Sequence, residues 1–298
     1  MKSMTLFNGD LAFSAYTCGF ETNKDQPLVI CLHGFPDNAL SFRHQLPVIA
    51  EAGYRVIAPT LRGYEPSSQP KNNDYSVISA AHDILVWMDQ LGEQKVHLVG
   101  HDWGAIISYA AGAIAPERFL SLTTLAVPHS ARFLDAVRKV PKQLLKSWYI
   151  FFFQLPGFAD YMLQRNDWSL IKTLWNNWSP DFDLTESDWQ ALRQTFNLPG
   201  VRHAMLSYYR QNLSLGVLAG IKKNAASFLT SVPVATLAIT GAQDGCVDTR
   251  LYEHAFSDQD FPKGFRIERL NDAGHFCHQE KPEIISTLLL DWFLENGI

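Results

Sequence analysis

The sequence predicts an α/β fold with a mostly parallel central sheet and helices on both faces. Apolar runs at 28–32, 55–58 and 95–100 are each followed by a loop that holds glycine or proline. Continuous runs of this kind are typical of strands that are covered on both faces. Helical spacing of apolar residues separates them, and such alternation indicates parallel βαβ units. With 298 residues, 47% of them hydrophobic and 18% charged, the chain can bury a large core.

The first elements follow in a regular order. Asn8-Gly9, between two short alternating runs, predicts a β-hairpin turn. The spacing in 77–91 predicts an amphipathic helix that Gly92 ends. A strand then turns into a helix at 98–105, and a further strand is expected at about 122–127.

Residues 131–226 interrupt this order. They are typical of several helices, with breaks at 156–157, 179–180 and 199–200, and they hold five of the eight tryptophans. The alternation resumes with a strand in 232–241, a short helix at 251–256, a strand at 266–270 and a helix at 282–295. We therefore expect a core domain made of residues 1–130 and 227–298, with 131–226 inserted as a helical cap. A cap of this kind would close over the C-terminal strand ends, where open α/β sheets bind ligands.

The segment LVGHDWGA at 98–105 has the layout of a nucleophile elbow. Gly100 and Gly104 flank Asp102, and glycine permits the close approach of strand and helix that this turn needs. A carboxylate suits displacement at a saturated carbon, whereas a serine hydroxyl suits attack on a carbonyl. The N-terminus of the following helix favours the ionised carboxylate, although Asp is also a favoured helix N-cap. Asp102 is the candidate nucleophile.

Two later loops supply an acid and a base. Asp244 and His275 follow Asp102 in the chain order nucleophile, acid, base that α/β hydrolases use. Each has a structural alternative, because Asp244-Gly245 is a common turn pair and His275 is one of ten histidines. Asp248 is a second candidate for the acid, but its position suits a helix N-cap better.

The loop His33-Gly34-Phe35-Pro36 follows the strand at 28–32. It can aim the backbone N–H of Phe35 at the site, beside that of Trp103, the residue after the nucleophile. We expect these two groups to form an oxyanion hole. The alternative is a tight turn that glycine and proline stabilise.

The motifs that extend over nearly the whole chain are HGFPD, RGY-x-x-SS-x-P, GHDWGA, the late acid loop and AGHF. Together they resemble those of the capped α/β hydrolases with an aspartate nucleophile, particularly the soluble-type epoxide hydrolases. Haloalkane and fluoroacetate dehalogenases share much of the pattern. However, haloalkane dehalogenases typically carry Asn after HG, where this chain has Phe35. Fluoroacetate dehalogenases carry Arg after the nucleophile, where this chain has Trp103. Glu65 departs from the family's usual glycine, in a loop with no catalytic role.

The resemblance also implies two cap tyrosines that donate hydrogen bonds to the epoxide oxygen. WYIFFFQLPG resembles the first cap motif and indicates Tyr149, and SYYR resembles the second and indicates Tyr209. Tyr208 is the alternative if the helix register differs by one residue. Apart from the family resemblance, an aromatic-rich helix more often forms part of the hydrophobic core than of a catalytic site. We expect Phe35, Trp103 and Phe153 to line the substrate pocket.

The resemblance implies hydrolysis of an apolar or aryl epoxide to a vicinal diol, and a role in detoxification. The epoxide would form an ester on Asp102, and water activated by His275, which Asp244 orients, would hydrolyse that ester. No cofactor or metal is expected. The nearest alternative is a haloalkane dehalogenase with the same triad, and a non-catalytic ligand receptor belongs to another class.

The partners that the resemblance implies are a small apolar epoxide and water, and composition argues against other kinds. The net charge of −5 argues against nucleic acid, and no run approaches the roughly 20 apolar residues of a membrane span. The N-terminal segment lacks the apolar run of a signal peptide, so a cytoplasmic protein is expected. The four cysteines form no CxxC pair, which indicates free thiols, and Cys246 and Cys277 are interpreted as small loop or core residues. A homodimer is left open.

Overall fold

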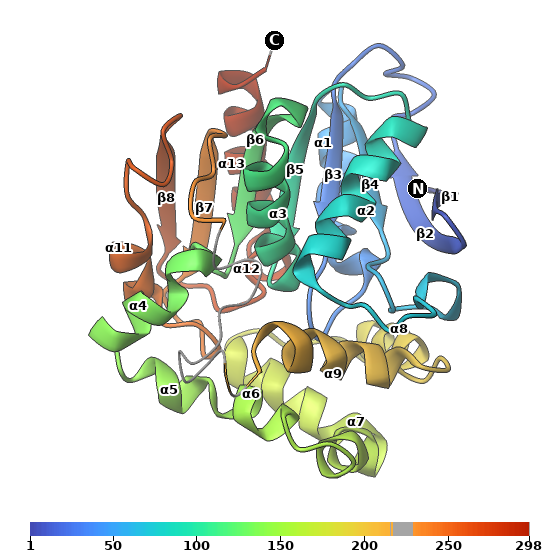
Figure 1. Ribbon diagram of the computed structural model, residues 1–298. Helices are drawn as coiled ribbons and strands as arrows, with labels where there is room; N and C mark the ends of the chain where they lie inside the picture. Colours follow the sequence, from blue (N-terminus) through green and yellow to red (C-terminus); the bar gives the residue numbers. More distant parts are fainter. Residues whose placement is uncertain (215, 217–228, 298) are drawn as a thin grey trace.

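The computed structural model describes residues 1–214, 216 and 229–297, and this part of the chain forms an eight-stranded sheet (Figure 1). Its order is β1-β2-β4-β3-β5-β6-β7-β8. β1 and β2 pair antiparallel with each other, β2 pairs antiparallel with β4, and the remaining neighbours are parallel. The strands are β1 (Lys2–Asn8), β2 (Leu11–Cys18), β3 (Leu28–Leu32), β4 (Arg55–Pro59), β5 (Val96–His101), β6 (Phe119–Leu125), β7 (Thr236–Gly241) and β8 (Phe265–Leu270).

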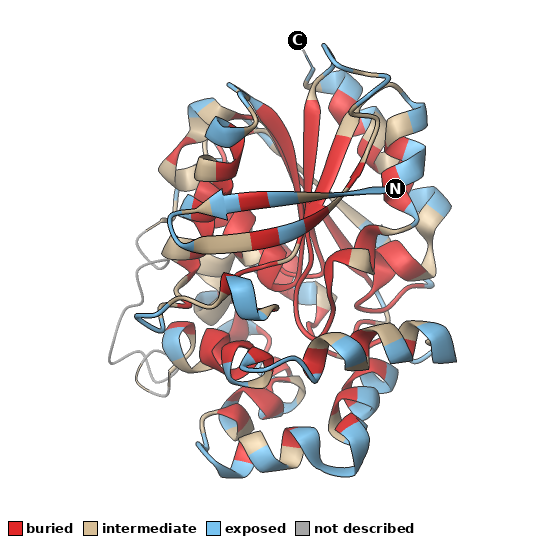
Figure 2. Cartoon of the chain, turned by 90° about the vertical axis from the view of Figure 1, so that its right-hand side faces the viewer, coloured by how far each residue is buried: buried red, intermediate tan, exposed pale blue. Residues whose placement is uncertain are grey.

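Helices cover both faces of the sheet, as the alternation predicts. α2 and α3 pack on each other, with α3 against β5 and β6, while α1 packs on β4 and α13 on β6. The helices of this core are α1 (Gln45–Glu51), α2 (Val77–Gln90), α3 (Trp103–Ile114), α11 (Tyr252–Ala255), α12 (Cys277–Glu280) and α13 (Pro282–Glu295). Every residue of β3 and β5 is buried (Figure 2), which is what a continuously apolar central strand requires.

A separate layer of helices lies below the C-terminal ends of the parallel strands (Figure 1). It consists of α4 (Phe133–Lys139), α5 (Gln143–Lys146), α6 (Trp148–Phe153), α7 (Phe158–Trp178), α8 (Glu186–Phe196) and α9 (Val201–Asn212). These helices lie between β6 and β7 in the chain, where the cap is expected. The expected boundary at 226–227 falls outside the described residues.

Local signals explain most element ends. Asn8 pairs with Leu11 across a two-residue loop, and Gly9 there has a φ of +57°, so the hairpin prediction is confirmed. Ser76 caps α2 by accepting a hydrogen bond from the N–H of Ser79. Short 3₁₀ turns connect other elements: η1 (Ala39–Phe42), η2 (Pro66–Ser68), η3 (Pro116–Arg118), η4 (Ser130–Arg132) and η6 (Thr249–Leu251).

Two strand predictions are wrong in their limits. The strand expected at 122–127 begins at Phe119 and ends at Leu125, because Ala126 adopts a φ of +64° and leaves the strand. The strand expected within 232–241 begins only at Thr236. Among the described residues, no helix is both long enough and apolar enough to cross a membrane.

Candidate active site

The turn between β5 and α3 holds Asp102 in a strained backbone conformation. Its φ is +51° and its ψ is −116°, in a region that costs a non-glycine residue about 1–3 kcal/mol. The flanking glycines are sterically required. A Cβ on Gly100 would lie 2.2 Å from the carbonyl oxygen of Gly104, and one on Gly104 would lie 2.2 Å from that of Leu32. The close contact of strand and helix therefore fixes Asp102 at the end of the sheet.

The loop after β3 holds one oxygen of the Asp102 carboxylate. The backbone N–H of Phe35 donates to Asp102 Oδ1 over 2.6 Å. Gly34 makes this approach possible, because a Cβ there would lie 2.5 Å from the same oxygen. For the N–H of Trp103, no hydrogen bond to this carboxylate is found within the described part of the chain, so its place in the oxyanion hole stays a prediction.

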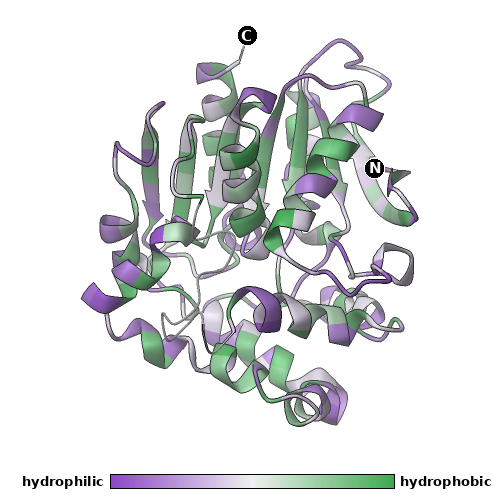
Figure 3. Cartoon of the chain, in the orientation of Figure 1, coloured by the Kyte–Doolittle hydropathy of each residue, from purple (hydrophilic) through white to green (hydrophobic). Residues whose placement is uncertain are grey.

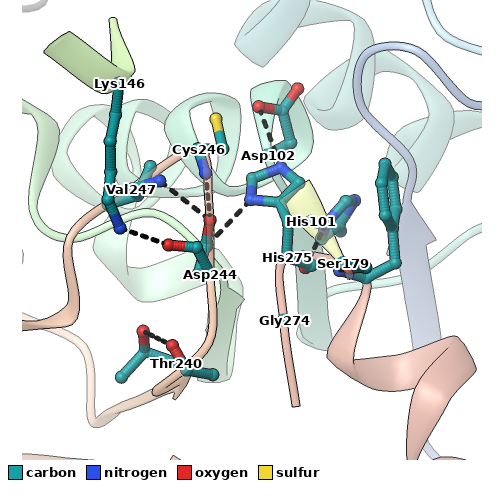
Figure 4. A network of polar contacts seen from close by, with 12 residues as sticks. His101, Asp102, Lys146, Ser179, Thr240, Asp244, Cys246, Val247, Gly274 and His275 are labelled. Carbon is teal, nitrogen blue, oxygen red and sulfur yellow. Dashed lines mark hydrogen bonds and ion pairs between the residues drawn. The ribbon is translucent and has the colours of Figure 1, made fainter. Parts of the chain in front are cut away.

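The structure brings Asp102, Asp244 and His275 together at the ends of β5, β7 and β8 (Figure 4). His275 Nδ1 lies 2.9 Å from Asp244 Oδ2, and His275 Nε2 lies 3.7 Å from Asp102 Oδ2. The backbone N–H groups of Cys246 and Val247 donate to Asp244 Oδ1 over 2.6 and 2.8 Å. One oxygen of Asp244 is thus fixed by its own loop, which leaves the other to orient His275.

Burial and charge act in opposite directions on His275. Its burial disfavours the imidazolium, but the Asp244 carboxylate, the neighbouring Cys246 and the Asp102 carboxylate together raise its pKa well above the usual value. The carboxylates of Asp244 and Asp102 therefore favour the imidazolium form of His275. Esterification of Asp102 would remove one of these anionic charges and lower the pKa of His275.

Asp248 serves as a helix cap. Its side chain accepts a hydrogen bond from the N–H of Arg250 at the start of η6 and forms an ion pair with the Arg250 side chain. The interpretation of Asp248 as an N-cap is confirmed. Its carboxylate is engaged there, whereas Asp244 contacts His275.

Three tyrosines of the cap lie near this trio in different ways. The Tyr149 hydroxyl is 3.3 Å from the Cys246 thiol, whereas the buried Tyr209 hydroxyl has no hydrogen-bond partner among the described residues. The Tyr209 ring packs edge-on against Phe35 and Trp103. The neighbouring Tyr208 instead donates its hydroxyl to the carbonyl of Arg62 over 3.0 Å. Both rings therefore contact Trp103 at the elbow, but the Tyr208 hydroxyl is bound to a core carbonyl.

Both Tyr149 and Tyr209 are neutral phenols. Burial raises the pKa of each well above the usual value, and the charge of Asp102 adds to the effect. Both groups can therefore donate a hydrogen bond to an oxygen placed between them and Asp102. Phe153 packs edge-on against Phe35 and against both tyrosine rings, so it lies where the substrate pocket is expected.

Two neighbours of the site are not evident from the sequence. Trp178 accepts hydrogen bonds at its carbonyl from the N–H groups of Gly245 and His275, and its ring lies 5.0 Å from those of His275 and Tyr149. Cys246 was expected only as a small loop residue, yet its thiol contacts Tyr149. Burial raises the pKa of this thiol. Neither position has a local sequence signal, because the contacts depend on how α6 (for Cys246) and α7 (for Trp178) pack against the acid loop.

Asp244, Cys246 and His275 also offer possible metal-ligand atoms within 4.8 Å of one another. However, the Asp244 carboxylate and His275 Nδ1 already bind each other over 2.9 Å. A metal ion there would have to break the contact that orients His275.

A buried polar network extends beneath the site. Asp37 accepts hydrogen bonds from the Ser41 hydroxyl and the Gln279 amide, each over 2.6 Å, and Ser41 also lies 2.7 Å from His278 Nε2. Burial raises the pKa of Asp37 to about 6 despite these hydrogen bonds.

The sheet order and the elbow between β5 and α3 define a protein of the α/β-hydrolase class. A family model described as "alpha/beta hydrolase fold" matches residues 27–282. The chain is 31% identical to epoxide hydrolase 4 of Homo sapiens over 92% of its own length and 74% of that protein. It is 32% identical to the AB hydrolase superfamily protein YfhM of Bacillus subtilis, over 92% of each chain. The crystal structure of epoxide hydrolase VrEH1 from Vigna radiata superposes with a TM-score of 0.80 at 27% identity, over 99% of this chain and 98% of that one. The chain therefore belongs to the epoxide hydrolases of the alpha/beta hydrolase fold family.

Proposed function

We propose that this protein hydrolyses an apolar or aryl epoxide to a vicinal diol through an ester on Asp102. The observation that carries the proposal is the pair of buried phenols opposite the elbow, and above all the Tyr209 hydroxyl, which has no hydrogen-bond partner among the described residues. An epoxide oxygen between Tyr149 and Tyr209 would supply the missing acceptor. The aromatic surroundings suit an apolar substrate held by a few directing polar groups.

In the first step, Asp102 Oδ2 attacks one ring carbon and the bond from that carbon to the epoxide oxygen breaks. Oδ1 stays on the N–H of Phe35 and becomes the carbonyl oxygen of the ester. The two phenols stabilise the alkoxide by hydrogen bonding. The alkoxide takes up a proton, and His275 gives one up, because its pKa falls when the charge of Asp102 disappears.

In the second step, His275 acts as the base. Its Nε2, which has no hydrogen-bond partner among the described residues, takes a proton from water while the hydroxide adds to the carbonyl carbon of the ester. The N–H of Phe35 then stabilises the oxyanion on Oδ1, a kind of contact worth about 3–4 kcal/mol in a studied protease. Collapse of this intermediate expels the diol, whose oxygen takes the proton from His275, and leaves Asp102 as a carboxylic acid. Transfer of that acid proton to His275 restores the Asp102 carboxylate and the starting state.

Turnover of an aryl epoxide and of a haloalkane tests the proposal. We expect diol formation by the wild type, none by Asp102→Asn, and a large loss in the double variant Tyr149→Phe/Tyr209→Phe. Haloalkane turnover that the double variant retains, without epoxide turnover, would make the protein a dehalogenase. Ligand binding without turnover would favour a receptor. A cytoplasmic location, a role in detoxification and the limits of the cap (131–226) stay predictions of this proposal.

A further inference from the structure

The outer surface of the cap exposes a run of large apolar side chains. Seven of the thirteen exposed large hydrophobic residues in the described part of the chain fall within 144–161. Figure 3 shows hydrophobic colouring along α5 and α6, at the end of the molecule away from the sheet. We call this surface the cap face, and it consists of Leu144, Leu145, Trp148, Phe151, Leu155, Phe158 and Tyr161.

The cap face is a preformed surface. Gln143 on α5 donates to the carbonyl of Cys246, and Lys146 donates to that of Asp244. On α6, Tyr149 and Phe153 are buried toward the site, while Trp148 on the same helix is exposed. The inner sides of these helices are therefore fixed to the acid loop and the pocket, whereas the apolar outer sides are exposed in the described part of the chain.

Basic residues flank the cap face. Residues 132–165 contain six lysines and arginines against two aspartates, in a chain whose net charge is −5. Arg132 pairs with Asp260 and Arg138 with Asp135, and Lys146 donates inward to the Asp244 carbonyl. No ion pair with Lys139 or Lys142 is found in the described residues, and both are exposed. Exposed leucine and aromatic residues beside lysines are the composition of helices that lie in a membrane interface.

From this juxtaposition we propose that the cap face binds the surface of an anionic lipid bilayer. The charge favours this occupant over a second copy of the chain, because a two-fold interface would place the same cations opposite one another. Trp148 and Tyr161 suit the headgroup level, where amphipathic rings concentrate. The inference goes beyond the proposed function and stands without it. Only one consequence rests on that function, namely that an apolar epoxide dissolved in the bilayer would reach the enzyme next to Tyr149.

The test is flotation of the full chain with vesicles of phosphatidylcholine, alone or with 30 mol% phosphatidylserine (a composition of roughly cellular surface charge). We expect binding that requires phosphatidylserine and weakens as salt rises. Leu145→Gln/Phe158→Gln should weaken binding by at least about tenfold, because both residues lie well out of the protein, at 78% and 56% exposure. Lys139→Gln/Lys142→Gln should weaken it by roughly 25-fold.

Leu294→Gln is the matched control. Leu294 is 75% exposed and lies on α13, which ends at the opposite end of the molecule (Figure 1). This variant should bind as the wild type does. Thermal unfolding, rather than activity, checks that each variant folds, so a failure of the proposed function leaves the test intact. Absence of wild-type binding to anionic vesicles would overturn the proposal. So would unchanged binding by Leu145→Gln/Phe158→Gln, or a solution dimer that this variant dissociates without any vesicle binding.

Discussion

Replacement of Tyr209 by phenylalanine should raise stability and lower activity. The buried Tyr209 hydroxyl has no hydrogen-bond partner among the described residues, and such a group costs about 1–3 kcal/mol. Because phenylalanine keeps the ring contacts with Phe35 and Trp103, Tyr209→Phe should raise the free energy of unfolding by about 1 kcal/mol. For a chain of this length, that gain corresponds to a rise in Tm of about 2 °C.

The same change removes one hydrogen bond to the alkoxide. A hydrogen bond to a charged group is worth about 1.5–3 kcal/mol, so ester formation should slow roughly 10- to 150-fold. Rapid quenching followed by intact-protein mass spectrometry measures the rate of ester formation, and urea unfolding measures the stability.

Tyr208→Phe is the neighbouring control. It removes the hydrogen bond to the carbonyl of Arg62, so it should lower the free energy of unfolding by about 1 kcal/mol and leave ester formation within about threefold. A destabilised Tyr209→Phe variant with an unchanged rate of ester formation would show that the Tyr209 hydroxyl does not bind the epoxide oxygen. A larger loss of rate in Tyr208→Phe would contradict this role of Tyr209 as well.

Three further variants test other parts of the site. Gly34→Ala should abolish activity and destabilise the fold, since its Cβ would lie 2.5 Å from Asp102 Oδ1; wild-type turnover would contradict the geometry of the loop. Asp244→Asn should lower the pKa of His275. It should also slow hydrolysis of the ester by about 10⁴-fold, the loss that the same change causes in a serine protease. An unchanged pH–rate profile would exclude Asp244 as the orienting acid. The pKa of Asp37 is raised to about 6 in the fold, so protonated Asp37 stabilises the protein at low pH. This contribution to the free energy of unfolding, about 3 kcal/mol, is lost as pH rises from about 4 to 6. The difference in unfolding free energy between the wild type and Asp37→Asn should change by that amount over this pH range, and a constant difference would show that Asp37 is not shifted.

The sheet and its two layers of helices could be predicted because their signals are local. The apolar run of β3 and the amphipathic spacing of α2 each determine one element without reference to distant residues. α1 was not predicted, since Gln45–Glu51 is short and contains Pro47. The end of β6 depends on the backbone of Ala126, whose N–H donates to the carbonyl of Ile239 on the neighbouring strand. Such long-range contacts leave no pattern in the local sequence.

The site likewise has residues that the local sequence predicts and residues whose contacts it does not. The glycines around Asp102 mark the elbow, because only a residue without a Cβ fits each of those contacts. The sequence indicates Tyr209 only through the family resemblance and leaves Tyr208 as the alternative, since the choice depends on how α9 is rotated against the core. The contact of Cys246 depends on the docking of α6 onto the acid loop, and that of Trp178 on the docking of α7, and no motif encodes either.

The most direct test of the proposed chemistry is intact-protein mass spectrometry of His275→Gln after incubation with an aryl epoxide. Without the base, the ester should accumulate. We therefore expect a mass gain equal to the whole epoxide, mapped to Asp102 and absent from the double variant Asp102→Asn/His275→Gln. The control is that the wild type consumes the same epoxide. If His275→Gln then gains no mass, or gains it at another residue, the assignment of Asp102 as nucleophile and His275 as base is contradicted.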